Sequence, residues 1–128
     1  MPSDNQYAGL HHVSLLVSDL SRSCDFYLRV LGLEQDHTRP DMAFQGIWLN
    51  IGAQQIHLIS LDKTSTGCAE GDPGRDAHFA ISVRNINKIA DILKREGVES
   101  HISKSGRKAL FCRDPDGNAI EFIQQINR

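Results

Sequence analysis

Four side chains in the sequence have the chemical types needed to bind a divalent metal ion: His12, His57, His78 and Glu121. Three imidazoles and one carboxylate form a nitrogen and oxygen ligand set that suits Zn, Ni, Co, Mn or Fe as divalent ions. A single histidine on a strand is more often structural or exposed, so the histidines alone do not establish a site. The prediction of a metal site depends on how the four positions match one another within the chain.

The chain repeats itself, and the four candidate ligands occupy matched positions in the repeat. Residues 12–17, HVSLLV, resemble residues 78–83, HFAISV, because each segment begins with histidine and alternates as a β-strand does. Residues 56–59, IHLI, align in the same way with residues 120–123, IEFI, which matches the second candidate histidine to the glutamate. Pseudo-symmetry between the halves would bring the two strand pairs towards one centre, and the four ligands would converge from rigid strands.

Each half of the repeat is predicted to form a strand, a helix and three further strands. Asp19 and Asn85 are good helix N-caps, and Gly32 and Gly97 can supply the left-handed residue that ends each helix. The predicted strands lie near 10–17, 34–39, 46–52, 55–61, 77–83, 99–103, 107–113 and 118–124, and the predicted helices near 20–31 and 86–96. The polar segment 62–76 is then the loop between the halves, either a link or a functional lid.

The predicted fold class is α+β, with two tandem βαβββ modules at about 10–61 and 77–124 in a single domain over residues 1–128. Each module is expected to hold a four-stranded mixed sheet with one helix on one face. The opposite faces stay free, and we expect them to form concave surfaces that enclose the metal site.

Glu121 is the candidate ligand with the most distinctive surroundings. It lies between Ile120 and Phe122 in an apolar strand, and a buried carboxylate needs a partner. A bound metal cation is one such partner, and an ion pair with the side chain of Arg107 or Arg113 is the alternative. Glu121 is also the only one of the four that could act catalytically as a proton-transfer base, by loosening from the metal. Two roles of Glu121 stay open: it could be a metal ligand that also acts as the base, or a metal ligand alone.

Composition excludes several other classes of protein. The 128 residues suit one substantial core, and the formal net charge of −2 with scattered basic residues argues against nucleic-acid binding. No apolar run approaches the roughly 20 residues that span a membrane, and residues 1–9 lack signal-peptide features, so we expect a cytoplasmic protein. Cys24, Cys68 and Cys112 form no C-x-x-C pair, and Cys24 and Cys112 are expected to be small buried residues.

Three motifs carry a resemblance to a known family. The stretch RDPDGNAIE at 113–121, with LHHV at 10–13 and VSDL at 17–20, resembles the vicinal-oxygen-chelate (VOC) superfamily. This superfamily includes glyoxalase I, methylmalonyl-CoA epimerase, fosfomycin-resistance enzymes, bleomycin-resistance proteins and extradiol dioxygenases. The resemblance covers about residues 10–124 and implies a homodimer in which each metal site draws ligands from both chains. The implied ligand positions fall on His12, His57, His78 and Glu121. Position 57 is a departure, because bacterial glyoxalase I has glutamate there.

The resemblance implies a metal-dependent glyoxalase-like enzyme, a lyase or isomerase whose divalent ion chelates and polarises vicinal oxygens of a small-molecule substrate. Three alternatives stay open: a fosfomycin-resistance-type thiol transferase, an extradiol-type dioxygenase, and a bleomycin-resistance-type protein that binds its ligand without chemistry. No organic cofactor is predicted. Trp48 could form one side of a substrate pocket, although a core position is more common for a lone tryptophan. Basic residues that could hold a substrate carboxylate or phosphate, rather than serve as solvated surface charges, are Arg39, Arg75, Arg107 and Lys108.

Overall fold

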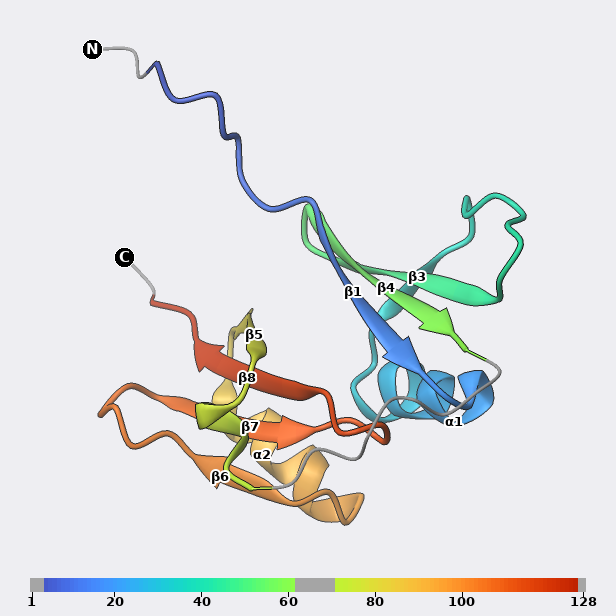
Figure 1. Ribbon diagram of the computed structural model, residues 1–128. Coiled ribbons are helices and arrows are strands. Elements are labelled where there is room, and N and C mark those ends of the chain that lie inside the picture. Colours follow the sequence, from blue (N-terminus) through green and yellow to red (C-terminus); the bar gives the residue numbers. More distant parts are fainter. Residues whose placement is uncertain (1–3, 62–70, 127–128) are drawn as a thin grey trace.

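Two four-stranded sheets, each with a helix against one face, form the body of the protein (Figure 1). The computed structural model describes residues 4–61 and 71–126. The first half contains β1 (His12–Val17), α1 (Leu20–Cys24), a π-helix (Asp25–Val30), β2 (Glu34–Asp36), β3 (Gly46–Ile51) and β4 (Gln54–Ser60). The second half contains a 3-10 turn (Pro73–Arg75), β5 (His78–Val83), α2 (Ile86–Arg95), β6 (Ser100–Ile102), β7 (Ala109–Arg113) and β8 (Ala119–Gln124).

The two sheets have the same topology. Their strand orders are β1-β4-β3-β2 and β5-β8-β7-β6. In each half, the strand that comes first in the sequence pairs parallel with the strand that comes last, β1 with β4 and β5 with β8. The remaining pairs of neighbouring strands are antiparallel. The sheets are therefore mixed, and the predicted α+β fold of tandem βαβββ modules is confirmed.

Local sequence signals explain where the helices begin and end. The side chain of Asp19 accepts a hydrogen bond from the backbone N–H of Arg22, and Asn85 caps the second helix in the same way. Gly32 and Gly97 have φ of +74° and +71°, in the left-handed region that glycine adopts at low cost. The four predicted capping positions are confirmed.

The predicted helix over 20–31 is present, but its second half is wider than an α-helix. The N–H of Leu31 donates to the carbonyl of Phe26 at 2.9 Å, a bond that spans five residues as in a π-helix. The strand predicted over 34–39 ends at Asp36, because that side chain accepts from the N–H and hydroxyl of Thr38 at 2.9 and 2.7 Å and turns the chain. In the predicted loop 62–76, residues 62–70 lie outside the described residues.

The apolar face of each sheet forms the core. Leu15 and Leu58 of the first sheet and Ile120 and Phe122 of the second belong to one connected cluster of buried side chains. Cys112 is fully buried in the same cluster, as predicted, and burial raises the pKa of its thiol to about 12. Cys24, in α1, is only half-buried. None of the helices within the described ranges is long and apolar enough to cross a membrane.

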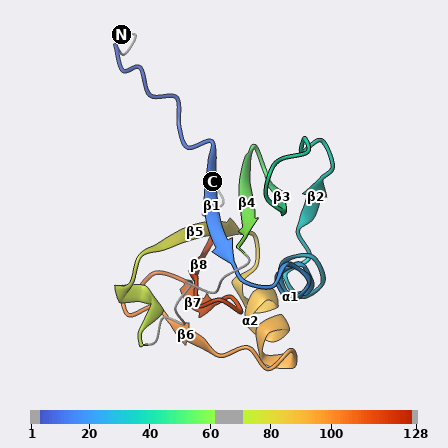
Figure 2. The same ribbon diagram turned by 45° about the vertical axis from the view of Figure 1, so that its right-hand side comes forward.

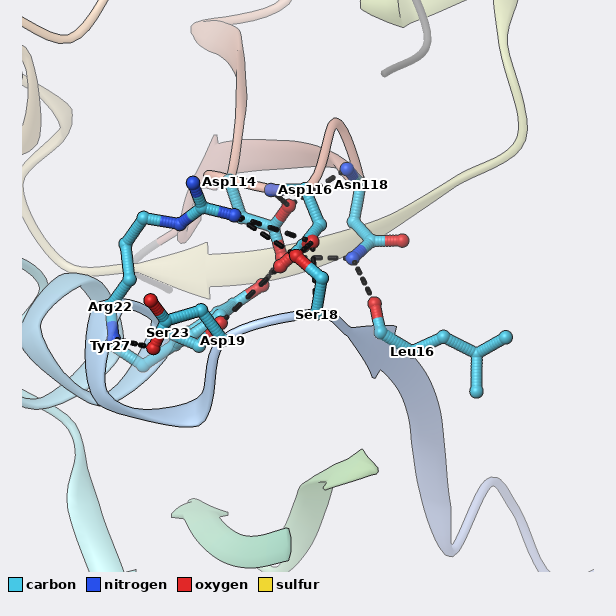
Figure 3. Close-up of polar contacts among 9 residues, drawn as sticks. All are labelled: Leu16, Ser18, Asp19, Arg22, Ser23, Tyr27, Asp114, Asp116 and Asn118. Atoms are coloured by element: carbon cyan, nitrogen blue, oxygen red, sulfur yellow. Dashed lines mark hydrogen bonds and ion pairs between the residues drawn. The ribbon is translucent and has the colours of Figure 1, made fainter. Parts of the chain in front are cut away.

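The turn between β7 and β8 joins the two halves (Figure 3). Oδ1 of Asp116 accepts from the backbone N–H and the hydroxyl of Ser18 at 3.0 and 2.6 Å. The hydroxyl of Tyr27 donates to Oδ2 of Asp114 at 2.7 Å, and the amide of Asn118 donates to a backbone carbonyl of β1 at 3.2 Å. Both aspartates are buried. The aspartate-rich turn therefore connects β8 to β1 and to the helix that follows β1.

A surface ion pair reinforces this connection at the helices. Figure 2 shows α1 and α2 on the same side of the molecule. Nη1 of Arg29 contacts Oε1 of Glu96 at 3.0 Å between the ends of the two helical segments. The halves thus meet through both their turns and their helices, while the opposite sheet faces carry the candidate ligands.

Candidate metal centre

The first pair of candidate ligands shares the face of the first sheet that is turned away from the core. His57 pairs with Ser14 across β1–β4 and with Trp48 across β3–β4. Because side chains alternate between faces, His12, two residues before Ser14, lies on the same face as His57. The rings of His12 and His57 stack with centroids 3.9 Å apart, and Trp48 stacks on His57 at 4.5 Å. Trp48 therefore lies beside the candidate site, which is where it would have to lie to form one side of a substrate pocket.

Hydrogen bonds orient both imidazoles of this first half-site, which we define as His12, His57 and Trp48. His57 Nε2 lies 2.8 Å from Gln55 Oε1, and His12 Nδ1 lies 2.8 Å from Nδ1 of His11. The nitrogens that would bind a metal ion are then Nδ1 of His57 and Nε2 of His12. Burial, followed by the neighbouring His12, lowers the pKa of His57 below its usual value. His57 is consequently neutral near pH 7, which is the protonation state of a metal ligand.

The second pair, His78 and Glu121, forms a second half-site on the other sheet. Glu121 is only 4% exposed, and its Oε1 lies 3.1 Å from His78 Nε2. The other ring nitrogen, His78 Nδ1, lies 2.9 Å from the backbone carbonyl of Asp76. Since a carbonyl can only accept, Nδ1 carries the hydrogen, and Nε2 of a neutral ring presents its lone pair to the carboxylate. Two acceptors that face each other are stabilised by a cation between them, either a proton on Nε2 or a metal ion bound to both.

The two predicted arginine partners of Glu121 have different positions. Nη2 of Arg107 lies 3.5 Å from Oε2 of Glu121, which is a weak contact. Arg113 does not contact Glu121; it donates to Asp76 Oδ2 at 3.0 Å and to the Gly117 carbonyl at 2.8 Å. The alternative ion pair of Glu121 is therefore observed for Arg107, and the suggestion of Arg113 was wrong.

The four candidate ligands do not form one cluster within a single chain. In the described ranges, 4–61 and 71–126, no group of three or more His, Cys, Asp or Glu side chains is placed to hold a metal ion. The structure instead brings them together in pairs, one on each sheet. A groove of about 420 Å³ between the sheets is bordered by His12 and His78. Completion of a four-ligand site from both pairs remains a prediction.

Some residues of these surfaces were not anticipated from the sequence. Gln55 lies two residues before His57, and this spacing on a strand is a signal that could have placed it beside the imidazole. Lys104 borders a pocket of about 470 Å³ that also contains His78 and Glu121. It lies in the turn between β6 and β7, where no pattern marks a functional residue.

Comparisons with known proteins agree with this architecture. The family model described as Glyoxalase/Bleomycin resistance protein/Dioxygenase superfamily matches residues 9–122. The lactoylglutathione lyase of Escherichia coli is 32% identical over 130 aligned residues, which cover 91% of this chain and 92% of that protein. Lactoylglutathione lyase GLX1 of Arabidopsis thaliana is 27% identical, and this chain spans only 43% of its length.

A solved structure shows the likeness of fold directly. The fosfomycin resistance protein FosX of Listeria monocytogenes superimposes with a TM-score of 0.73 at 18% identity, over 92% of both chains. Together with the family match across most of the sequence, these comparisons show that the chain belongs to the Glyoxalase/Bleomycin resistance protein/Dioxygenase superfamily.

Proposed function

We propose that the protein is a metal-dependent enzyme of the glyoxalase type, a lyase or isomerase that acts on a small substrate with vicinal oxygens. The observation that carries this proposal is the second half-site, where Nε2 of the exposed His78 faces Oε1 of the buried Glu121 at 3.1 Å. A buried carboxylate that faces an imidazole lone pair favours a shared cation. The lactoylglutathione lyases among its relatives support the reaction class.

The donor set fits a divalent metal ion. His12 and His57 offer nitrogen donors from one face, and His78 and Glu121 offer a nitrogen and an oxygen from another. Such mixed ligation suits Zn, Ni, Co, Mn or Fe. When bound, an ion of this kind would chelate two substrate oxygens and stabilise the negative charge that develops on them.

The chain's own residues then have separate tasks. Glu121 is the one carboxylate of the set, and we propose that it takes the proton from the substrate as well as serving as a ligand. Its burial keeps bulk water away from the reacting atoms, and the hydrogen bond of His78 Nδ1 to the Asp76 carbonyl keeps Nε2 directed at Glu121. Trp48, stacked on His57, supplies an apolar wall on the opposite half-site.

We propose further that each complete site is shared between two chains of a homodimer. Within the described part of one chain the ligand pairs lie on separate sheets, and no group of three ligands is close enough to act alone. The ligand-bearing faces are also accessible: His12 and His78 are both exposed, and Leu16 on the same face of β1 is 44% exposed. A two-fold axis that pairs the first half-site of one copy with the second half-site of the other makes two identical sites.

Subunit exchange tests the shared site. His12→Ala and Glu121→Ala would each inactivate every site of their own homodimers, because the two residues belong to different halves. A mixed dimer would contain one intact site and one doubly broken site, so random reassortment should restore up to about a quarter of the wild-type activity. The assay is turnover of hemithioacetals and related 2-oxo and 2-hydroxy compounds, with the metal identified by elemental analysis of protein purified without chelator.

The control variant is His101→Ala, because His101 lies on β6 beside Glu99 rather than in either half-site. Mixing it with either inactive variant should give the activity expected from its own intact sites. No recovery between the two inactive variants, despite proven subunit exchange, would contradict the shared site. Lack of turnover with every divalent metal would contradict the proposed enzyme class.

A further inference from the structure

We propose that Asp36 is a positioning residue that acts through the amide of Gln55 and fixes which ring nitrogen of His57 carries the hydrogen. The hydrogen is held on Nε2, which leaves the lone pair on Nδ1. The inference rests on the proposed function in one respect, because it names the nitrogen that would bind the metal ion. The contacts that carry it all lie within the first half and do not depend on a bound ion.

The strand register gathers these side chains on the sheet face that carries the first half-site. Asp36 of β2 pairs with Trp48 of β3, and Trp48 pairs with His57 of β4. Gln55 lies two residues before His57, so both side chains project from the same face of β4. The Gln55 amide is therefore placed where it can contact the carboxylate of β2 with one end and the imidazole of β4 with the other.

Two contacts fix the orientation of the Gln55 amide. Its Nε2 lies 2.7 Å from Oδ2 of Asp36 and 2.9 Å from Oδ1 of Asn50. An ionised carboxylate can only accept, so the NH2 group of Gln55 must face Asp36. The amide oxygen Oε1 is then turned towards His57, 2.8 Å from Nε2. Because this oxygen can only accept, Nε2 of a neutral His57 ring must donate, and Nδ1 keeps its lone pair.

Asp36 is itself held in one orientation. Its Oδ1 accepts from the backbone N–H and the hydroxyl of Thr38 at 2.9 and 2.7 Å, which leaves Oδ2 to face Gln55. The hydrogen bonds from Thr38, followed by that from Gln55, lower the pKa of Asp36. The side chain is therefore an ionised acceptor with a fixed direction. It sets the orientation of the amide and, through the amide, the tautomer of His57.

The variant Asp36→Asn should reverse the tautomer. The bonds from Thr38 retain an oxygen at the Oδ1 position, so the new NH2 group faces Nε2 of Gln55. Two donors then oppose each other, and the Gln55 amide should turn over; the exposed Asn50 can present either end of its own amide. The NH2 group of Gln55 then donates to Nε2 of His57, and the ring hydrogen moves to Nδ1. The measurement is 15N NMR of the imidazole nitrogens in metal-free full-length protein at about pH 9, well above the ordinary histidine pKa of about 6.5.

A double variant should restore the original tautomer. In Asp36→Asn/Gln55→Glu, the carboxylate at position 55 accepts from the new amide with one oxygen and from Nε2 of His57 with the other. Asp91→Asn is the matched control, because it makes the same change at an exposed position of α2 in the other half. A His57 ring that keeps its hydrogen on Nε2 in Asp36→Asn, or that does not regain it in the double variant, would overturn the positioning role.

Zinc titration separates this inference from the proposed function. Trp48 is the only tryptophan and stacks on His57, so its fluorescence reports metal binding. We expect Asp36→Asn to weaken zinc binding about tenfold, the loss typical of a partner that orients a ligand, and the double variant to restore it. Equal zinc affinities of Asp36→Asn and Asp91→Asn would overturn the assignment of Nδ1. Tautomer reversal in a protein that binds no divalent metal would support the positioning role and reject the metal enzyme.

Discussion

The hydrogen bond between Tyr27 and Asp114 offers a quantitative test of how the two halves are joined. Tyr27 is fully buried, Asp114 is 5% exposed, and the hydroxyl donates to Oδ2 at 2.7 Å. Tyr27→Phe removes this donor and preserves the volume of the ring. A hydrogen bond to a charged group contributes about 1.5–3 kcal/mol to the free energy of unfolding.

The surroundings of Asp114 place the effect in the lower part of that range. In the Tyr27→Phe variant, Oδ2 of Asp114 still accepts a hydrogen bond from the Asn118 amide at 2.9 Å. Its Oδ1 still accepts hydrogen bonds from the backbone N–H groups of Asp116 and Asn118 at 2.9 and 2.8 Å. The carboxylate is therefore not left without partners in the variant. We expect a loss of about 1.5–2 kcal/mol, which for a domain of this size lowers Tm by about 5–9 °C.

The assay is denaturant unfolding at neutral pH, with Tyr7→Phe as the matched control. Tyr7 is 88% exposed, so its hydroxyl should contribute less than about 0.5 kcal/mol. If Tyr27→Phe also changed the free energy of unfolding by less than about 0.5 kcal/mol, the turn would not stabilise the contact between the halves as argued.

The same pair predicts a dependence on alkaline pH. Burial, followed by the charge of Asp114, raises the pKa of Tyr27 well above its usual value. A raised folded-state pKa contributes stability that is fully present below the unfolded pKa of about 10 and is lost as the pH rises towards the folded value. The stability advantage of the wild type over Tyr27→Phe should therefore shrink above about pH 10, and a constant difference would contradict this assignment.

Three further predictions concern individual positions. The Cys112 thiol, whose pKa burial raises to about 12, should resist iodoacetamide at pH 8 in folded protein and react in denaturant; equal rates mapped by mass spectrometry would contradict its burial. Gly46→Ala should cost more than about 2 kcal/mol in denaturant unfolding, because its Cβ would press on a backbone carbonyl of β4, and an unchanged midpoint would refute that contact. Zinc should change the fluorescence of Trp48 in the wild type, and His57→Ala should weaken that response about tenfold or more; an unaltered titration curve would remove His57 from the ligand set.

Most of the fold could be predicted from the sequence, because the relevant signals are local. Alternation of apolar residues identified the first strand of each half, and the internal repeat and the capping residues Asp19 and Asn85 placed the other strands and the starts of both helices. The errors lie at element ends. There, side-chain bonds such as that of Asp36 to Thr38 compete with the strand ladder and turn the chain early.

The internal repeat predicted that the four candidate ligands converge on one centre, and the structure of one chain brings them together only in two pairs. His12 and His57 meet because β1 and β4 pair in parallel, and His78 and Glu121 meet because β5 and β8 do the same. The internal repeat identifies residues that occupy equivalent positions in the two halves. Because both halves have the same strand topology, such residues also lie beside equivalent strands. The equivalence of the four positions could thus be predicted from the sequence, whereas the pairing of ligands within each sheet came from the strand pairing in the structure.

Only the tertiary structure decided which charged partner each group receives. Arg107 and Arg113 were equivalent candidates for Glu121 in the sequence, yet Arg113 is held by Asp76 and Gly117 while Arg107 reaches the carboxylate. The stretch RDPDGNAIE at 113–121 was singled out in the sequence only for its resemblance to a family, whereas in the structure its Asp116 binds Ser18, 98 residues away. Periodicity and capping depend on neighbours within a few residues, so the sequence determines them by itself. Long-range polar contacts depend on the packing of one half against the other, and no local pattern encodes that packing.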